Sequence, residues 1–376
     1  MALFLFVLFF NFEVPLPTLR AIIIANETID CCQMKKIAFF LLLLPLSAFL
    51  LAQSASKPTV FELFQTEDYL SITLESDYQN LIKNKNRDDY QPAVITYTDE
   101  DGKPVRWELE IKPRGKMRRR ICSMPPLKLK FPKSEIKAKG LAKFKTLEMV
   151  DICNPTPAYQ QYVLREYVAY KLYNMLTNQS FRVQLVKVDF INTGGKKEPM
   201  DGFCILIENN EEMAKRLGGK IIEPVSINRK VPNSSEKELF SMFQYMIGNT
   251  DWWYATAHNM DIFCKLDSIM PIPIPYDFDY SGFVNTTYSV PNDKIPVKYV
   301  TDRFYIGPCM PSETTKKTIQ LFLDKKADML KYCNDFPYFT KYTRKSTIKY
   351  LKSFFATIEK ESGIKNSIYK TCNFYE

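Results

Sequence analysis

The chain of 376 residues has only one histidine, His258, and this scarcity excludes several mechanisms. A catalytic mechanism that pairs a serine or a cysteine with a histidine would have to use it. No Gly-x-Ser-x-Gly segment occurs, and no cysteine stands out as a nucleophile. We therefore expect His258 to stabilise its own loop through ring hydrogen bonds. No Cys-x-x-Cys pair is present, so the sequence does not indicate a zinc site.

The chain also lacks a basic tail and, beyond its N-terminal segment, any internal repeat. With 46% hydrophobic and 25% charged residues, its composition is that of an ordinary globular protein. Its length allows one large domain or two smaller ones. The net charge of +9 suits an anionic partner such as phosphate, nucleic acid or a membrane surface, but it selects none of them.

The N-terminal segment has the pattern of a secretory signal peptide. Lys35 and Lys36 follow Met34, an apolar run covers residues 37–51, and small residues lie at 52–56. We expect translation to begin at Met34 and cleavage to remove everything up to residue 56. This predicts a secreted or periplasmic protein with no stable membrane span after cleavage. The alternative is a true N-terminal membrane anchor.

Seven cysteines follow this segment, and some could pair in an oxidising compartment. Cys122 with Cys153, and Cys309 with Cys333, are two candidate disulfides. The sequence alone leaves both pairings open.

Alternation of apolar and charged residues predicts strands in the first half of the chain. In the strand expected over 127–131, Lys128 and Lys130 lie on the face opposite to the leucines. The other elements expected here are a strand over 105–113, a helix over 159–176, and a hairpin of strands over 181–192 and 203–208.

The second half reads as mostly helical. We expect a helix over 235–249 that Ser235 caps and Gly248 ends. The other expected elements are two short strands over 261–266 and 272–278 and helices over 312–332 and 339–361. The predicted organisation is therefore a β-rich part with one long helix, 57–208, followed by a mostly helical part, 209–376.

Two aspartates, Asp277 and Asp279, end the apolar run "IPIPYDFD". A carboxylate near a core is costly unless a positive charge or a donor meets it. Asp277 and Asp279 could simply pair with Arg303 or with the cations of residues 114–120. Asp251 and Asn259 lie in a loop that follows a helix, and the hairpin between Asn259 and Asp277 folds the chain back towards that loop. Such oxygen ligands suit Mg²⁺ together with phosphate oxygens. We therefore expect one aspartate of the pair to hold a metal ion.

The first half supplies the matching cations. Residues 111–120, "IKPRGKMRRR", are strongly basic, and Gly115 permits close approach of the backbone to a phosphate. We expect Arg118 and its neighbours to form a solvated basic turn. Lys130 on its strand is expected to reach nucleotide phosphates, and Glu166 in the following helix is a candidate partner that would hold this lysine.

In this order, the segments resemble the CotH kinase-like family and, more remotely, HipA-type kinases, both atypical relatives of the protein kinase fold. The resemblance covers most of the chain from about residue 105 to residue 285. Five segments carry the resemblance. In the first part of the chain, "KPRG…PPLKLKF" is similar to the family's Arg-Gly segment and lysine-bearing strand, "YVLREYVAYKLYNML" is similar to its next helix, and "DGFCILIENNEEMAKR" is similar to its strand that enters the interlobe hinge. In the second part, "GNTDWWYATAHN" is similar to the catalytic loop, and "IPYDFDYSG" is similar to the metal-binding segment.

The resemblance implies an α+β, bilobal kinase-like fold and phosphoryl transfer from ATP with Mg²⁺ or Mn²⁺ to a protein or a small hydroxyl substrate, with no nucleic-acid partner. Asp251 would orient the attacking hydroxyl and accept its proton. The nucleotide would be bound by Arg114, Gly115, Lys130, Glu166 and Glu208, the last bordering the adenine, and the metal by Asn259, Asp277 and Asp279.

The chain departs from the kinase pattern in three ways. Asn259 follows Asp251 by eight residues, whereas protein kinases place their asparagine about five residues after the aspartate. There is no Asp-Phe-Gly and no glycine-rich loop. A non-catalytic surface or periplasmic binding or assembly protein of the same fold is therefore the alternative. A sugar-active protein that uses Asp251 and Asp277 as an acid/base pair is a third hypothesis, without support for the required separation.

Overall fold

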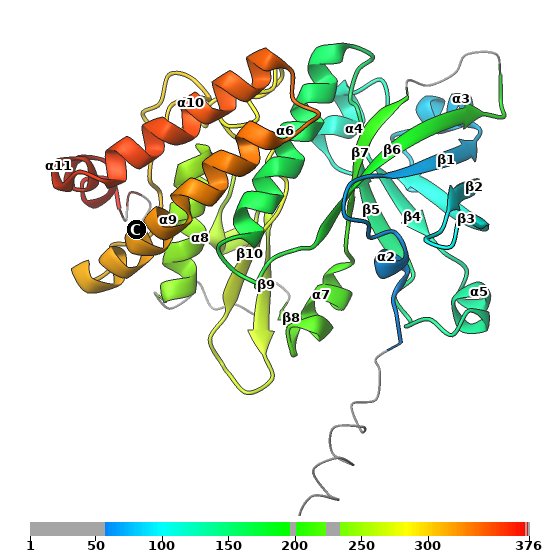
Figure 1. Ribbon diagram of the computed structural model, residues 1–376, viewed down its shortest axis with the longest axis horizontal. Helices are drawn as coiled ribbons and strands as arrows, with labels where there is room; N and C mark the ends of the chain where they lie inside the picture. Colours follow the sequence, from blue (N-terminus) through cyan, green and yellow to red (C-terminus); the bar gives the residue numbers. More distant parts are fainter. Residues whose placement is uncertain (1–56, 196–200, 223–233, 373, 375–376) are drawn as a thin grey trace, which may run out of the picture. The chain divides into compact units, whose positions relative to one another are not determined.

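The computed structural model describes residues 57–195, 201–222, 234–372 and 374, so the predicted signal peptide lies outside the described residues. The described residues belong to one compact unit, Lys57–Glu376. This unit has a mixed α+β fold, with strands concentrated in its first half and helices in its second half, as the sequence predicts (Figure 1).

Seven strands form a closed barrel in the order β1-β2-β3-β4-β5-β7-β6. Neighbouring strands pair antiparallel, except that β1 and β6 pair in parallel and so close the barrel. The bilobal arrangement implied by the kinase resemblance is not clear, because the sheet closes on itself. The strands are β1 (Leu70–Ser76), β2 (Gln91–Thr98), β3 (Pro104–Pro113), β4 (Leu127–Lys130), β5 (Thr146–Val150), β6 (Val183–Asn192) and β7 (Gly202–Ile207).

Alternation along β3 and β4 separates the barrel interior from its outer face, which confirms the predicted strands. Leu127 and Leu129 are fully buried, whereas Lys128 and Lys130 are partly exposed on the opposite face. The register pairs Lys130 with Glu110 and Lys128 with Lys112. The barrel core contains large apolar side chains that include Trp107, Phe131, Leu74, Ile95 and Leu206.

The long helix α6 (Pro157–Asn174) confirms the helix predicted between the strands. It packs against β6 and β7, and its buried residues belong to the core shared with the C-terminal helices. This explains why the helix shows little amphipathic pattern in its sequence, since both of its sides are covered. The shorter helices of this half are α2 (Val60–Leu63), α3 (Tyr78–Lys83), α4 (Met117–Ile121) and α5 (Lys133–Ala138).

A three-stranded antiparallel sheet in the order β10-β9-β8 interrupts the helical half. Its strands β9 (Met260–Lys265) and β10 (Ile272–Pro275) confirm the predicted hairpin, whereas β8 (Gly219–Ile222) was not predicted. The helices are α7 (Asn210–Arg216), α8 (Ser235–Ile247), α9 (Ser312–Asp335), α10 (Lys341–Ile358) and α11 (Glu361–Ile364), with a 3₁₀ turn at Tyr254–Thr256 and a π-helical turn at Lys365–Tyr369.

The ends of α8 follow from local hydrogen bonds. The Ser234 side chain accepts a hydrogen bond from the Lys237 N–H, so the cap is Ser234 and the prediction of Ser235 is wrong by one residue. Gly248 ends the helix in the left-handed conformation, with a φ of 63°.

Two disulfides join distant segments. The predicted pair Cys122–Cys153 is confirmed. The predicted partner of Cys309 is wrong, because Cys309 pairs with Cys372 near the C-terminus. Cys333 instead is a free thiol, and α9 directs it into the core among the C-terminal helices.

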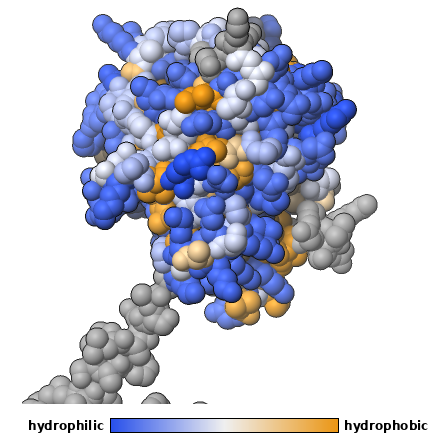
Figure 2. All heavy atoms as spheres, turned by 90° about the vertical axis from the view of Figure 1, so that its right-hand side faces the viewer, coloured by the Kyte–Doolittle hydropathy of each residue, from blue (hydrophilic) through white to orange (hydrophobic). Residues whose placement is uncertain are grey.

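The face that the barrel presents is predominantly hydrophilic, with hydrophobic side chains in separate small areas (Figure 2). Within the part of the chain that the structure describes, no helix combines the length and the apolar character that crossing a membrane requires.

Candidate functional site

A cavity of about 170 Å³ lies where the barrel meets the β9–β10 hairpin. Four side chains predicted for the site line this cavity, and they come from four separate elements. They are Arg114 after β3, Glu166 on α6, Glu208 after β7 and Asp277 after β10.

The loop between α8 and β9 folds around Asp251. The Asn259 side chain donates hydrogen bonds to the backbone oxygen of Asp251 at 2.8 Å and to its carboxylate at 3.0 Å. The predicted ring hydrogen bond of His258 is present, with Nε2 lying 3.0 Å from Asp251 Oδ1. This hydrogen bond raises the pKa of His258. Because the Asn259 amide nitrogen is committed to Asp251, the amide oxygen is the group free to act as a ligand.

The β9–β10 hairpin then brings this loop to Asp277. The N–H of Tyr276 donates to the backbone oxygen of Asn259 at 3.2 Å, immediately beyond the last strand pair. Burial raises the pKa of the neighbouring Tyr280 phenol, and three carboxylates raise it further, those of Asp279, Asp251 and Asp277. The hairpin expected from the sequence therefore joins the Asp251 loop to the residue before Asp277.

The backbone is left-handed at two residues of the same region. Asn259 and Asp277 adopt φ values of 53° and 62°, which asparagine and aspartate tolerate better than other residues with a side chain. Tyr170 on α6 supports the second of these, because its hydroxyl accepts a hydrogen bond from the Asp277 N–H at 3.0 Å. Glu166 lies one helical turn before Tyr170, so a single face of α6 serves the site.

Arg118 lies among three carboxylates. Its guanidinium is 2.7 Å from Asp279 Oδ2, 2.5 Å from Glu166 Oε2 and 3.7 Å from Asp277 Oδ1. Burial opposes its charge, but the carboxylates of Asp279 and Glu166 outweigh this and raise the pKa of Arg118. The expectation of a solvated basic turn is wrong for this residue, because remote acidic groups compensate its charge in the interior.

One guanidinium does not neutralise three carboxylates. Desolvation raises the pKa of Glu166, with Asp279 adding to the effect and Arg118 opposing it. Desolvation and the Asp279 carboxylate likewise raise the pKa of Asp277, although 43% of the Asp277 side chain is exposed. Glu166 and Asp277 therefore favour either a proton or a second cation beside Arg118, and Asp277 is the accessible member of this acidic group.

Asp279 and Glu166 have different contacts from those predicted. The side chain of Asp279 is 6% exposed, and its Oδ2 binds Arg118 and also accepts a hydrogen bond from Tyr288. We therefore assign Asp279 to anchoring its turn and not to the metal. The proposed contact of Glu166 with Lys130 is wrong, because Glu166 pairs with Arg118.

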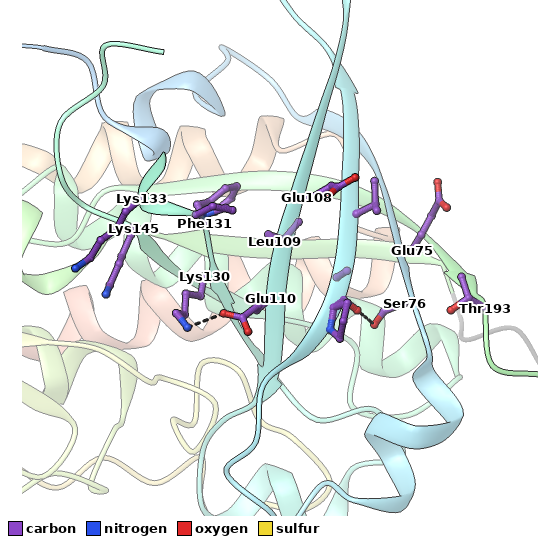
Figure 3. Close-up of a pocket in the computed structure, with 14 residues that line it drawn as sticks. Glu75, Ser76, Glu108, Leu109, Glu110, Lys130, Phe131, Lys133, Lys145 and Thr193 are labelled. Atoms are coloured by element: carbon purple, nitrogen blue, oxygen red, sulfur yellow. Dashed lines mark hydrogen bonds and ion pairs between the residues drawn. The ribbon is translucent and has the colours of Figure 1, made fainter. Parts of the chain in front are cut away.

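Lys130 lies outside the cavity. Its Nζ pairs with Glu110 at 2.6 Å, and Lys130 lines a separate cavity of about 630 Å³ over β1 to β4, at one end of which Lys133 and Lys145 lie side by side (Figure 3). None of the residues lining that cavity belongs to the acidic group. Lys128, two residues earlier on the same face of β4, lines the 170 Å³ cavity instead. Lys128, and not the predicted Lys130, is therefore the lysine of β4 at this cavity.

The loop between β3 and α4 reaches the same cavity. Arg114 pairs with Glu148 of β5 at 2.5 Å, and both line the cavity. Gly115 has a φ of 77°, which its lack of a side chain permits. Lys116 lies near enough to His258 for its charge to oppose the effect of Asp251 on the histidine pKa. The basic loop therefore extends from the cavity to the Asp251 loop.

Glu208 is fully enclosed in the cavity wall. Two arginines hold its carboxylate, Arg182 at 2.8 Å and Arg216 at 2.5 Å. The Arg182 N–H also donates to it at 2.7 Å. Its side chain therefore fixes the segment between β7 and α7.

The sequence reasoning missed Lys128 and Tyr170, whereas the pairing of Asp277 and Asp279 with a cation of residues 114–120, which it had left open, is made by Arg118. The i, i+4 spacing of Glu166 and Tyr170 was a signal that both face one side of the helix. For Arg118, no local signal existed, because its partners are separated from it by long stretches of chain.

Comparison with known proteins finds a distant structural similarity and no sequence match. No family model and no curated protein matches the chain. Among solved structures, the chain is similar to the crystal structure of a Helicobacter pylori proinflammatory kinase, CtkA, with a TM-score of 0.37 and 9% identity. The match covers 65% of this chain and 95% of that chain.

Proposed function

We propose that the chain is an ATP-dependent phosphotransferase of the CotH kinase-like type, which transfers a phosphoryl group to a hydroxyl of a protein or a small molecule. One observation carries the proposal. Asp277 lines a cavity together with Arg114 and Lys128, and the loop in which Asn259 holds Asp251 is hydrogen-bonded to the residue before Asp277. Phosphoryl transfer needs such a combination of positioning groups, oxygen ligands and cations.

The donor set fits a metal ion that arrives with a nucleotide. In the described residues, no group of three or more histidine, cysteine or acidic side chains is arranged to hold a metal by itself. Mg²⁺ is, however, commonly bound through one or two protein oxygens while phosphate and water complete its coordination. Asp277 and Asn259 would hold it, and the acidic group around Arg118 favours a cation there. The metal would neutralise charge on the transferred phosphoryl group.

The protein's own residues divide the remaining work. Asp251, oriented by Asn259 and His258, would accept the proton of the attacking hydroxyl. Lys128 takes the position proposed for Lys130 and would contact phosphate oxygens together with Arg114. Because Arg114 is paired with Glu148, a phosphate must replace Glu148 on this guanidinium.

Export belongs to the same proposal. Two disulfides support an oxidising compartment, since such bonds are rare in the cytosol. The secreted or periplasmic location rests otherwise on the N-terminal sequence.

The test is a thermal shift with ATP and Mg²⁺ or Mn²⁺, with chelator added as the control. Ligand at about a hundred times its Kd stabilises a folded protein by ~2.7 kcal/mol. We expect stabilisation only when nucleotide and metal are both present, and loss of turnover but not of binding in Asp251→Asn. A protein with no response to any nucleotide and metal pair would contradict the proposal.

One observation favours the second candidate, a non-catalytic binding protein of the same kind. The cavity, about 170 Å³, is smaller than the ~300–1,000 Å³ of ordinary ligand pockets, and Glu148 already occupies Arg114. Binding of Mg²⁺ and ATP without transfer to any acceptor would support this candidate.

A further inference from the structure

The helix that carries Arg118 into the site has few contacts of its own. Arg118 is the buried residue of the five-residue helix α4, while Met117 and Ile121 are 49% and 42% exposed. No side chain caps the N-terminus of the helix. A helix of this length is not stable alone. Its position must therefore be set by what holds its ends.

The C-terminal end of α4 is held covalently. Cys122 directly follows the helix, and its N–H donates to the backbone oxygen of Arg118 at 2.9 Å. Cys122 forms the buried disulfide with Cys153, and the N–H of Ser123 donates to the Cys153 oxygen at 2.9 Å. The end of α4 is thus fixed to the segment that follows β5.

That segment leads into the other half of the ion pair. Cys153 lies just before α6, which carries Glu166 and Tyr170. The disulfide therefore links the helix of Arg118 to the start of the helix of Glu166, whose charges meet at 2.5 Å. Arg118 in turn binds Asp279 and so anchors the turn that presents Asp277.

We propose that the Cys122–Cys153 disulfide is a positioning element of the candidate site, acting through Arg118. The disulfide holds α4 so that the guanidinium stays between Glu166 and Asp279, and this fixes the turn of Asp277. The inference rests on the proposed function, because it concerns the affinity of the site for a nucleotide and its metal. Without the bond, only hydrogen bonds hold the end of α4, from Ser123 to Cys153 and from Lys85 to the backbone oxygens of Arg120 and Cys122, so the anchor of the turn that carries Asp277 becomes weaker.

The second disulfide provides a matched control. Cys309–Cys372 closes a loop of 63 residues and Cys122–Cys153 one of 31, so loop entropy alone makes the control bond at least as important for stability. Affinity for ADP with Mg²⁺ is measured by calorimetry in three oxidised proteins, the wild type, C122S/C153S and C309S/C372S. We expect at least a tenfold loss of affinity in C122S/C153S and less than a twofold change in C309S/C372S.

Arg118→Gln, with both disulfides intact, tests whether the disulfide acts on the site through Arg118. We expect it to lose affinity to a similar extent, and combining it with C122S/C153S should cause little further loss, because both changes remove the same constraint. Arg118→Lys, which keeps the charge, should retain more affinity than Arg118→Gln.

The outcomes separate the inference from the function. Wild-type affinity in C122S/C153S, or full additivity with Arg118→Gln, overturns the inference and leaves the proposed function standing. If C122S/C153S does not fold, Arg118→Gln decides, since unchanged affinity there overturns the inference. A wild type that does not bind ADP with Mg²⁺ contradicts the proposed function, and the inference falls with it.

Discussion

Replacing Asp277 with asparagine should make the ligand-free protein more stable while removing its response to nucleotide and metal. Asparagine tolerates the left-handed backbone that Asp277 adopts, so the substitution removes charge and little else. The carboxylate of Asp277 lies 3.7 Å from Arg118, but Asp279 and Glu166 already neutralise that guanidinium. Desolvation, and then repulsion from the Asp279 carboxylate, therefore raise the pKa of Asp277 against the attraction of Arg118.

The magnitude follows from these distances. Asp277 Oδ1 and Glu166 Oε2 both contact Arg118 Nη2, at 3.7 and 2.5 Å. Two like charges ~6 Å apart repel by ~3 kcal/mol at an effective dielectric of ~20. Attraction to Arg118 and the 43% exposure of Asp277 reduce this, and about 0.5–1 kcal/mol of net stabilisation is expected. For a protein of this size, that corresponds to a rise in Tm of ~1–3 °C.

The pH dependence of the stability difference between Asp277→Asn and the wild type follows from the raised pKa of Asp277. A carboxyl whose pKa is raised on folding stabilises the folded state only while protonated, so its contribution is lost as pH rises above the ordinary aspartate range. The advantage of Asp277→Asn should therefore be absent near pH 4 and grow with increasing pH.

The assay is a thermal melt from pH 4 to 8, with and without ATP and Mg²⁺. Asp279→Asn is the matched control two residues away. It weakens a buried ion pair, so it should lower stability by ~2–4 kcal/mol. If Asp277→Asn is less stable than the wild type at pH 8, or still responds to ATP with Mg²⁺, the account of the acidic group is refuted.

Three further predictions concern other parts of the structure. Lys128→Met should weaken nucleotide affinity about tenfold in titration calorimetry, because Lys128 lines the candidate cavity. Lys130→Met should change the affinity little, because Lys130 pairs with Glu110 in the other cavity. Burial raises the pKa of Glu212 on α7 to about 7, so the stability that Glu212 contributes is lost as pH rises from ~4.5 to 7. Glu212→Gln should therefore flatten this part of the stability profile and exceed the wild type in unfolding free energy at pH 8, on the order of 2 kcal/mol. Gly248→Ala should lower the unfolding free energy by at least ~1 kcal/mol in urea titrations, because φ is 63° and the new Cβ would lie 2.0 Å from the Tyr350 hydroxyl.

The elements with a clear period were predictable from the sequence. Alternation in 127–131 correctly separated buried leucines from outward lysines, and the long run 159–176 without glycine or proline located α6. The hairpin that joins Asn259 to Asp277 followed from two short apolar runs. These signals are local, so one sequence sufficed.

The predictions that were wrong concern contacts with partners far away in the sequence. Lys128 and Lys130 share one face of β4, and only the register against β3 and the position of the cavity separate them. Arg118 reads as one member of a basic turn until Glu166 and Asp279 are brought to it by the fold. Cys309 finds its partner only because the C-terminal segment returns after α10. Sequence patterns do not record such distances in space.

The parallel pairing of β1 with β6 sets an order of events for a nascent chain. β1 leaves the ribosome early, but its partner follows only after all of β2 to α6. Until then, one edge of β1 exposes unpaired backbone groups that can recruit strands of other chains. Contacts between such distant segments also form slowly. A truncated chain that stops before Val183 lacks β6 and keeps this edge open, so fragments of the barrel should aggregate where the whole chain does not.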